Sequence, residues 1–176
     1  FKIQNQSINE ISKKMTPDIS IHDAAQSGNI GAIELHLHLG QEVDARDADE
    51  QTPLHFATQG GRNEIAKLLI ANGADVNAKK DGGFTPLFFV AFGRNLETTQ
   101  ILIANGADVN AKSDDGETPL DWAVATMLAY NRDRVSIIHQ KTALEIAKLL
   151  RKNGAKTTKG LKAEQKKLDF VNQTIN

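Results

Sequence analysis

The sequence predicts an all-α protein in which short antiparallel helix pairs stack along one axis as a solenoid. The first observation is a tripeptide, Thr-Pro-Leu, that begins at Thr52, Thr85 and Thr118, at intervals of 33 residues. The second is an octapeptide, Asn-Gly-Ala-Asp-Val-Asn-Ala-Lys, that occupies 72–79 and recurs unchanged at 105–112. A period of this length is typical of helical repeats, which bury their apolar faces only by stacking on neighbours.

Each unit contains residues that begin and end two helices. Thr52 followed by Pro53 suits a helix N-terminus, because the hydroxyl can cap free amides and proline fits the first helical position. A second helix is predicted over 65–70, where apolar side chains recur at helical spacing. Gly73 ends that helix at a position suited to left-handed backbone. The polar stretch 74–83 then leads to the next Thr-Pro start.

The first and fourth units depart from this pattern. One period before Thr52, Ile19 and Ser20 stand where the other units have Thr-Pro, as expected of a terminal unit with a solvated outer face. The fourth unit has fifteen extra residues between its two predicted helices, around 128–142. Their apolar content predicts that both helices are lengthened, with the turn at 131–134.

These strings resemble the motifs of the ankyrin repeat family. Thr-Pro-Leu-His at 52–55 and Gly-Ala-Asp-Val-Asn at 73–77 carry the resemblance, which covers roughly residues 18–157. It implies a curved stack of helix pairs joined by projecting, hairpin-like loops. We expect repeats at 18–46, 47–79, 80–112 and 113–157, an N-terminal capping helix or extension at 1–17, and a basic helix or tail at 158–176.

Composition narrows the class of protein. The 176 residues are 40% hydrophobic and 24% charged, which is ordinary for a soluble globular protein, and the chain has no cysteine for disulfides or thiolate chemistry. The net charge of −1 hides an asymmetry, since 1–150 carry a net −6 and 151–176 a net +5. The compartment stays open. A cytoplasmic protein is the first expectation and a secreted or periplasmic one the alternative, because the chain begins at Phe1 without Met.

The titratable residues do not predict catalysis. His36 and His38 lie two apart in a predicted helix, so they point to different faces rather than toward one metal ion. His22 and His55 occupy the repeat's own His position, which the family resemblance implies holds neighbouring loops together by hydrogen bonds. The acidic residues at 114–117 lack the alternating oxygen ligands of a calcium loop. We therefore expect a non-catalytic protein with no cofactor and no metal.

The resemblance implies a protein partner bound on the concave face, which loop tips and inner helices form. Lysines of the C-terminal tail could contact phosphates, but the repeat body is acidic and no aromatic residues alternate with those lysines, so nucleic acid is not expected. No apolar run is long enough to span a bilayer. We expect a monomeric interaction module; a structural or self-associating unit of a larger protein is the alternative, ahead of an enzyme or a nucleic-acid binder.

The contact residues follow from the family positions. At loop tips they are Arg46, Asp49, Gln51, Lys79, Asp81, Phe84, Lys112, Asp114, Asp115 and Glu117, and on inner helices Gln59 and Phe92. The insertion adds a second candidate surface at Tyr130, Arg132 and Arg134. That insertion is open to another interpretation, namely a helix extension that seals the C-terminal end of the stack.

Phe84 and Phe92 are aromatic where the repeat usually has polar residues. Interface anchors are often aromatic and central, so both rings are candidates for partner contact. The alternative is that each ring folds onto a neighbouring repeat, where Phe88 and Phe89 would form a local core. The acidic residues at 114–117 beside them indicate a partner segment with basic character.

Overall fold

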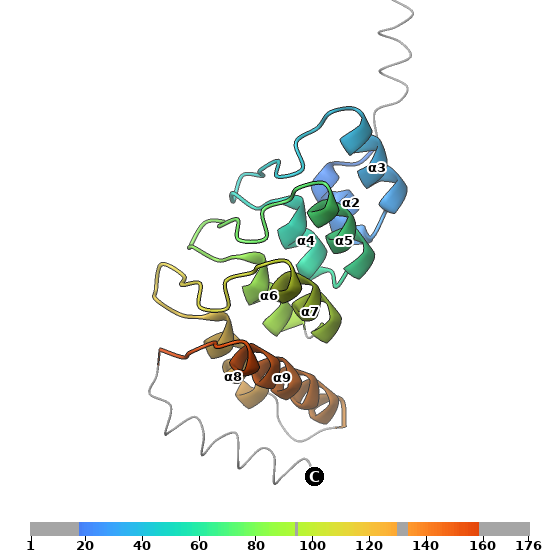
Figure 1. The fold of residues 1–176 in the computed structure, drawn as a ribbon. Coiled ribbons are helices and arrows are strands. Elements are labelled where there is room, and N and C mark those ends of the chain that lie inside the picture. Colours follow the sequence, from blue (N-terminus) through green and yellow to red (C-terminus); the bar gives the residue numbers. More distant parts are fainter. Residues whose placement is uncertain (1–17, 94, 130–133, 159–176) are drawn as a thin grey trace, which may run out of the picture.

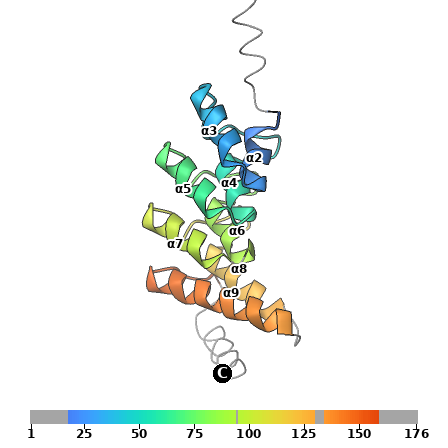
Figure 2. The same cartoon turned by 90° about the vertical axis from the view of Figure 1, so that its right-hand side faces the viewer.

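The computed structural model describes residues 18–93, 95–129 and 134–158, which form a stack of helix pairs with loops projecting from one side (Figure 1). The helices are α2 (Ile21–Ser27), α3 (Ile30–His38), α4 (Pro53–Gln59), α5 (Asn63–Ala71), α6 (Pro86–Gly93), α7 (Leu96–Ala104), α8 (Pro119–Ala129) and α9 (Arg134–Lys152). Inner helices α2, α4, α6 and α8 form one column and α3, α5, α7 and α9 the other (Figure 2). This confirms the all-α solenoid. The N-terminal helix or extension predicted at 1–17 lies outside the described residues, as does the basic helix or tail predicted at 158–176 from residue 159 on.

Helix ends lie where the repeated motifs place them. Helices α4, α6 and α8 each begin at the proline of a Thr-Pro pair. Gly73, Gly106 and Gly154 follow the outer helices with φ of 90°, 87° and 87°, which is left-handed backbone that glycine adopts without strain. In the first repeat Ser20 takes the cap, and its hydroxyl oxygen accepts the backbone N–H of Asp23 at 3.0 Å.

The apolar core runs through the stack between the two columns of helices. Leu54, Leu87 and Leu120, one repeat apart, are fully buried in their inner helices. In the first repeat His36 occupies the position that Leu69 fills in the second, and its Nε2 lies 2.8 Å from the carbonyl oxygen of Ile19. This bond gives the ring of the buried His36 a polar partner, so a histidine is tolerated at a position that is apolar in the second repeat.

The fourth helix pair is longer than the others. Helix α8 has 11 residues and α9 has 19, whereas α4 and α5 have 7 and 9. Figure 2 shows α9 extending past the other outer helices. The insertion therefore lengthens both helices, as the sequence predicts, and α9 exposes Ile138 over 65% of its surface. Tyr130 and Arg132 lie outside the described residues, as does the side chain of Arg134.

Among the helices described here, none is both long and apolar enough to cross a bilayer.

Candidate functional site

Long basic side chains join successive loops. Nη1 of Arg46 donates to the carbonyl oxygen of Lys79 at 2.8 Å, and Nζ of Lys79 donates to that of Lys112 at 3.2 Å. Arg46 also pairs with Glu50 at 3.2 Å. Arg46, Lys79 and Lys112 are exposed, as a partner-binding role requires. Two of these three predicted contact residues thus also hold the loops together.

A second ladder runs along the helix side of the loops. Nδ2 of Asn77 donates to the carbonyl oxygen of Gly106 at 3.0 Å, while its Oδ1 accepts the N–H of Asp108 at 2.7 Å. Asn110 makes the same two bonds to the segment after α9, at 3.1 and 2.8 Å. Asp44, the first member of the ladder, is a carboxylate and can only accept. These bonds make the projecting loops one connected platform.

Histidines tie the loops to the inner helices, which confirms the role that the repeat motif implies. Nε2 of His55 lies 3.1 Å from the carbonyl oxygen of Phe84, and Nδ1 accepts the N–H of Thr52 at 3.1 Å. His22 bonds the carbonyl oxygen of Ala45 at 2.8 Å. Burial of His55 disfavours its charged form and lowers its pKa from 6.5 to about 4.

The third repeat lacks such a partner at this position. Phe88 stands where the second repeat has His55, and the buried Oγ1 of Thr85 has no hydrogen-bond partner among the described residues. In the fourth repeat Asp121 restores the bond and accepts from Oγ1 of Thr118 at 2.8 Å. An unpaired buried hydroxyl costs about 1–3 kcal/mol, so the third repeat loses hydrogen bonding in exchange for an aromatic ring.

That ring supports a group of partly exposed aromatic side chains, Phe84, Phe89 and Trp122, which we call the aromatic shelf. The ring centroid of Phe84 lies 5.1 Å from that of Trp122 and 6.5 Å from that of Phe89. The fully buried Phe88 lies beneath, 5.3 Å from Phe84 and 5.9 Å from Trp122. Distances and tilts of this kind are typical of favourable aromatic pairs.

The shelf answers part of the question that the sequence left open. Phe84 folds onto the third and fourth repeats and still keeps part of its surface exposed. Phe88 forms the local core, whereas Phe89, expected beside it in the core, is only partly buried. The side chain of Phe92 lies outside the described residues, so its exposure stays a prediction.

Two glycines allow Phe84 to lie where it does. A Cβ added to Gly82 would stand 2.7 Å from Cε2 of Phe84, so the ring packs against bare backbone. A Cβ on Gly83 would stand 2.6 Å from Oδ1 of Asp114. Both glycines have positive φ, 84° and 75°. The tip of this loop therefore needs glycine at both positions to bring the shelf and the next loop together.

Sequence reasoning missed Lys80. At the same position of the neighbouring loops Asp47 and Ser113 accept a backbone N–H from Gln51 and Glu117, at 2.8 and 3.2 Å. A lysine has no acceptor, and the ammonium of Lys80 instead lies 5.8 Å from the ring centroid of Phe89. Comparing the three loops position by position was the signal that could have identified it.

Trp122 was also missed, although it occupies the position of Phe56 and Phe89 in the earlier repeats. Its indole Nε1 donates to Oε2 of Glu117 at 2.7 Å, which fixes a carboxylate beside the ring. The exposed carboxylates of Asp81, Asp114, Asp115 and Glu117 form what we call the acidic rim. Within the described part of the chain none of these four takes part in an ion pair.

Gln51 does not expose its side chain as a loop-tip contact residue would. Its amide nitrogen donates to Oδ2 of Asp47 at 3.2 Å, and its amide oxygen accepts from Nε2 of Gln59 at 2.8 Å. Burial alone would raise the pKa of Asp47, but hydrogen bonds from the N–H groups of Gln51 and Asp49 outweigh it and lower that pKa. Gln51 thus belongs to the internal structure of its loop, while Asp49 is exposed.

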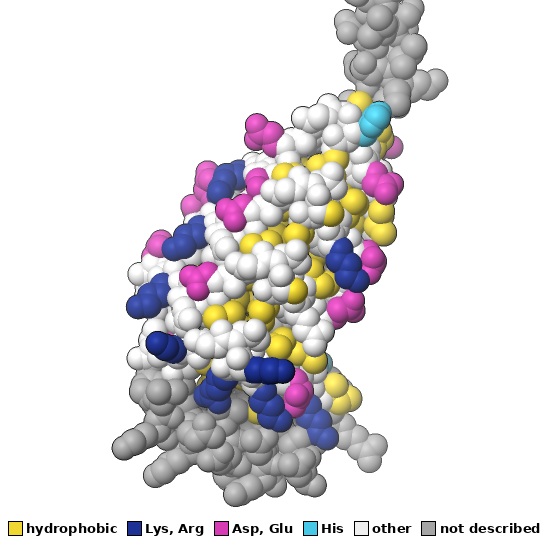
Figure 3. Space-filling model, viewed as in Figure 1, with side chains coloured by type: hydrophobic (Ala, Val, Ile, Leu, Met, Phe, Trp, Pro, Cys, Tyr) yellow, Lys and Arg dark blue, Asp and Glu magenta, His cyan; other side chains and the backbone are white. Residues whose placement is uncertain are grey.

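The face seen in Figure 3 does not carry one sign of charge. Acidic and basic side chains alternate along the projecting loops, and hydrophobic side chains appear between the loops and the outer helices. Lys and Arg side chains gather at the fourth-repeat end of this face, whereas their alternation with carboxylates along the loops does not favour a polyanion there.

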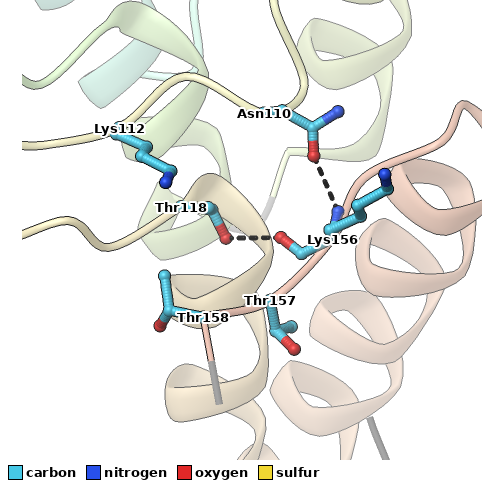
Figure 4. Close-up of a pocket in the computed structure, with 6 residues that line it drawn as sticks. All are labelled: Asn110, Lys112, Thr118, Lys156, Thr157 and Thr158. Carbon is cyan, nitrogen blue, oxygen red and sulfur yellow. Dashed lines mark hydrogen bonds between the residues drawn. The ribbon is translucent and has the colours of Figure 1, made fainter. Parts of the chain in front are cut away.

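A cavity of about 400 Å³ lies where the last loop meets the segment after α9, lined by Asn110, Lys112, Thr118, Lys156, Thr157 and Thr158 (Figure 4). Oγ1 of Thr118 donates to the carbonyl oxygen of Lys156 at 3.0 Å, and Oδ1 of Asn110 accepts its N–H at 2.8 Å. The ammonium of Lys112 points toward Thr118, whereas that of Lys156 points away. The two cations do not converge, and the hydrogen bonds here join the last loop to the segment after α9.

Comparison with known proteins gives two family matches. A model described as ankyrin repeats in three copies matches residues 21–113. A second, described as ankyrin repeats in many copies, matches residues 93–139. No curated protein matches the chain.

Proposed function

Because the chain belongs to the ankyrin repeat family, whose members are generally non-catalytic protein-interaction modules, we propose that it binds a protein partner at the aromatic shelf. The shelf supplies partly exposed aromatic surface where the third and fourth repeats meet, and the acidic rim and Lys80 surround it with charge. Aromatic anchors framed by polar groups are typical of the energetically dominant part of an interface.

One observation carries the proposal. Residues that lack the hydrogen-bonding groups found at the same positions of other repeats lie together at the shelf. Lys80 replaces a loop-closing acceptor, Phe84 replaces the buried Gln51, and Phe88 replaces the loop-tying His55. Each change removes a hydrogen bond that another repeat makes. Departures of this kind from local stabilising chemistry are expected at functional sites.

Substitution with a matched control tests the proposal. Phe84→Ala and Trp122→Ala should each weaken binding of the partner, once identified by crosslinking, by at least about tenfold, as interface anchors do. Phe56→Ala removes a partly buried ring from the same helix position as Trp122, two repeats away from it, and should leave affinity within about twofold.

Affinity is measured by titration calorimetry on variants whose circular dichroism shows folded protein. Equal loss in all three variants would indicate a general effect of destabilisation. Undiminished binding by both shelf variants would contradict the assignment of this surface.

A further inference from the structure

We propose that the aromatic shelf binds a basic peptide segment, with a lysine or arginine side chain lying on Phe84 and Trp122 and reaching the acidic rim. The inference rests on the proposed function and adds the chemical class of the partner. Three observations carry it: the hydrogen-bonded pair of Trp122 and Glu117, the position of Lys80, and the exposed rim carboxylates, which form no ion pair within the described residues.

The first observation is the pairing of an aromatic ring with a carboxylate. The bond from Nε1 of Trp122 to Glu117, at 2.7 Å, uses one carboxylate oxygen and leaves the other available as an acceptor. A guanidinium or ammonium group is attracted both to the face of an aromatic ring and to a carboxylate. Because the two groups are already held side by side, a cation binds them without first ordering either one.

The second observation is a cation already present on the same aromatic cluster. The ammonium of Lys80 lies 5.8 Å from the ring centroid of Phe89, within the range of a cation–π contact. That contact involves a ring of α6, whereas the Trp122 ring of α8 is paired with the carboxylate of Glu117. A second cation is therefore placed at Trp122, where the carboxylate of Glu117 offsets repulsion from Lys80.

The third observation is the charge of the rim. Its four carboxylates are exposed and have no ion-pair partner within the described residues, and Asp114 packs against Gly83 at the tip of the Phe84 loop. A positive segment meets complementary potential here, whereas an acidic segment would face repulsion. A purely apolar segment would leave these charges close to a dry interface without compensation.

The single tryptophan of the chain makes the test direct, because fluorescence excited where only tryptophan absorbs reports Trp122 alone. The full chain is titrated with a blocked peptide of repeated Gly-Arg-Gly units, and with matched peptides in which glutamine or glutamate replaces arginine. The arginine peptide should change the emission of Trp122 in a saturable way. The glutamine and glutamate peptides should not.

Charge-neutral variants of the rim separate recognition from general attraction. Glu117→Gln and the double variant Asp114→Asn with Asp115→Asn should each weaken the arginine peptide by about tenfold. Glu97→Gln, a carboxylate on outer helix α7 that pairs with Lys67, is the matched control and should leave affinity unchanged. Equal effects of Glu97→Gln and Glu117→Gln would overturn the proposal, since attraction would then follow net charge only.

Three further outcomes also overturn it. Binding of the arginine peptide that appears only after Lys166→Gln and Lys167→Gln would show that the chain's own C-terminal segment is the occupant. A partner that needs Phe84 and Trp122 but tolerates Glu117→Gln would refute the basic class while leaving the proposed function intact. A partner whose binding tolerates substitution of Phe84 and Trp122 as well as Glu117→Gln would refute both proposals.

Discussion

A single position in the repeat decides how each inner helix is held at its N-terminus. The second repeat has His55, the third Phe88 and the fourth Asp121 at this position. His55 and Asp121 bond the capping threonine, whereas Phe88 cannot. Phe88 also lies beneath the shelf and packs against Phe84 and Trp122. The residue at this position therefore affects both local stability and the proposed binding surface.

The buried neutral His55 makes stability depend on pH. Its pKa is about 4 in the folded state and about 6.5 when exposed, so the unfolded chain binds more protons between these values. The stabilisation is complete above about pH 6.5 and is lost as the pH falls toward 4, on the order of 3 kcal/mol in all. Urea unfolding at pH 7 and pH 4.5 measures it.

A variant without this titrating group is the control for that experiment. In His55→Asn the difference in unfolding free energy between the two pH values should shrink markedly, because the variant lacks the buried imidazole. A pH dependence identical to that of the parent would show that His55 is not the linked group.

Thr85 and Thr52 make a matched pair for testing the unpaired hydroxyl. Thr85→Val removes a buried Oγ1 that has no partner and should raise the unfolding free energy by about 1 kcal/mol. Thr52→Val removes an Oγ1 that lies 2.9 Å from Nδ1 of His55 and should lower it by a similar amount. Chemical denaturation measures the unfolding free energy of both variants. A loss of stability in Thr85→Val would contradict the interpretation that its hydroxyl is buried without a partner.

The elements themselves follow largely from local sequence. Thr-Pro pairs begin α4, α6 and α8 because a cap and a preset φ are local properties, and the glycines after the outer helices end them for the same reason. The fifteen-residue insertion predicts longer helices because its apolar residues continue the helical spacing. The helix ends that these motifs mark can therefore be predicted without tertiary information.

The shelf could not be predicted in the same way, because it combines residues from two repeats. Whether Phe84 is exposed depends on the bare backbone of Gly82 and on the ring of Trp122, 38 positions later. Lys80 and Trp122 look unremarkable in their own repeats. The buried side chain of Gln51 likewise depends on a bond to Gln59 from the following helix.

The loop ladder allows a prediction at the level of elements. Asp44 accepts the N–H of Asp75 at 3.0 Å but cannot donate, whereas Asn77 at the next step does both. Asp44→Asn should keep the existing bond, add one to the carbonyl oxygen of Gly73, and raise the unfolding free energy by about 1 kcal/mol.

Asn77→Asp is the reverse control for this prediction. It removes the donor to Gly106 and should destabilise the chain by a similar amount. Thermal unfolding monitored by circular dichroism measures both variants. A fall in melting temperature for Asp44→Asn would show that the ladder does not act as described.

The molecule as a whole is a regular stack of repeats, except that the third and fourth repeats meet through the aromatic shelf. In repeat proteins each unit contacts only its neighbours, so stability is distributed along the chain and one boundary can change without altering the rest. The boundary between the third and fourth repeats is where aromatic side chains and the acidic rim meet. The connected loops hold that surface in place, so the proposed site is already formed before a partner binds.

Amide hydrogen exchange with and without the bound partner locates the binding surface along the chain. We predict slower exchange at 80–89 and 113–122, which contain the shelf and the rim, with little change in α3 and α5. Slowed exchange confined to the outer helices or to α9, with 80–89 and 113–122 unaffected, would contradict it.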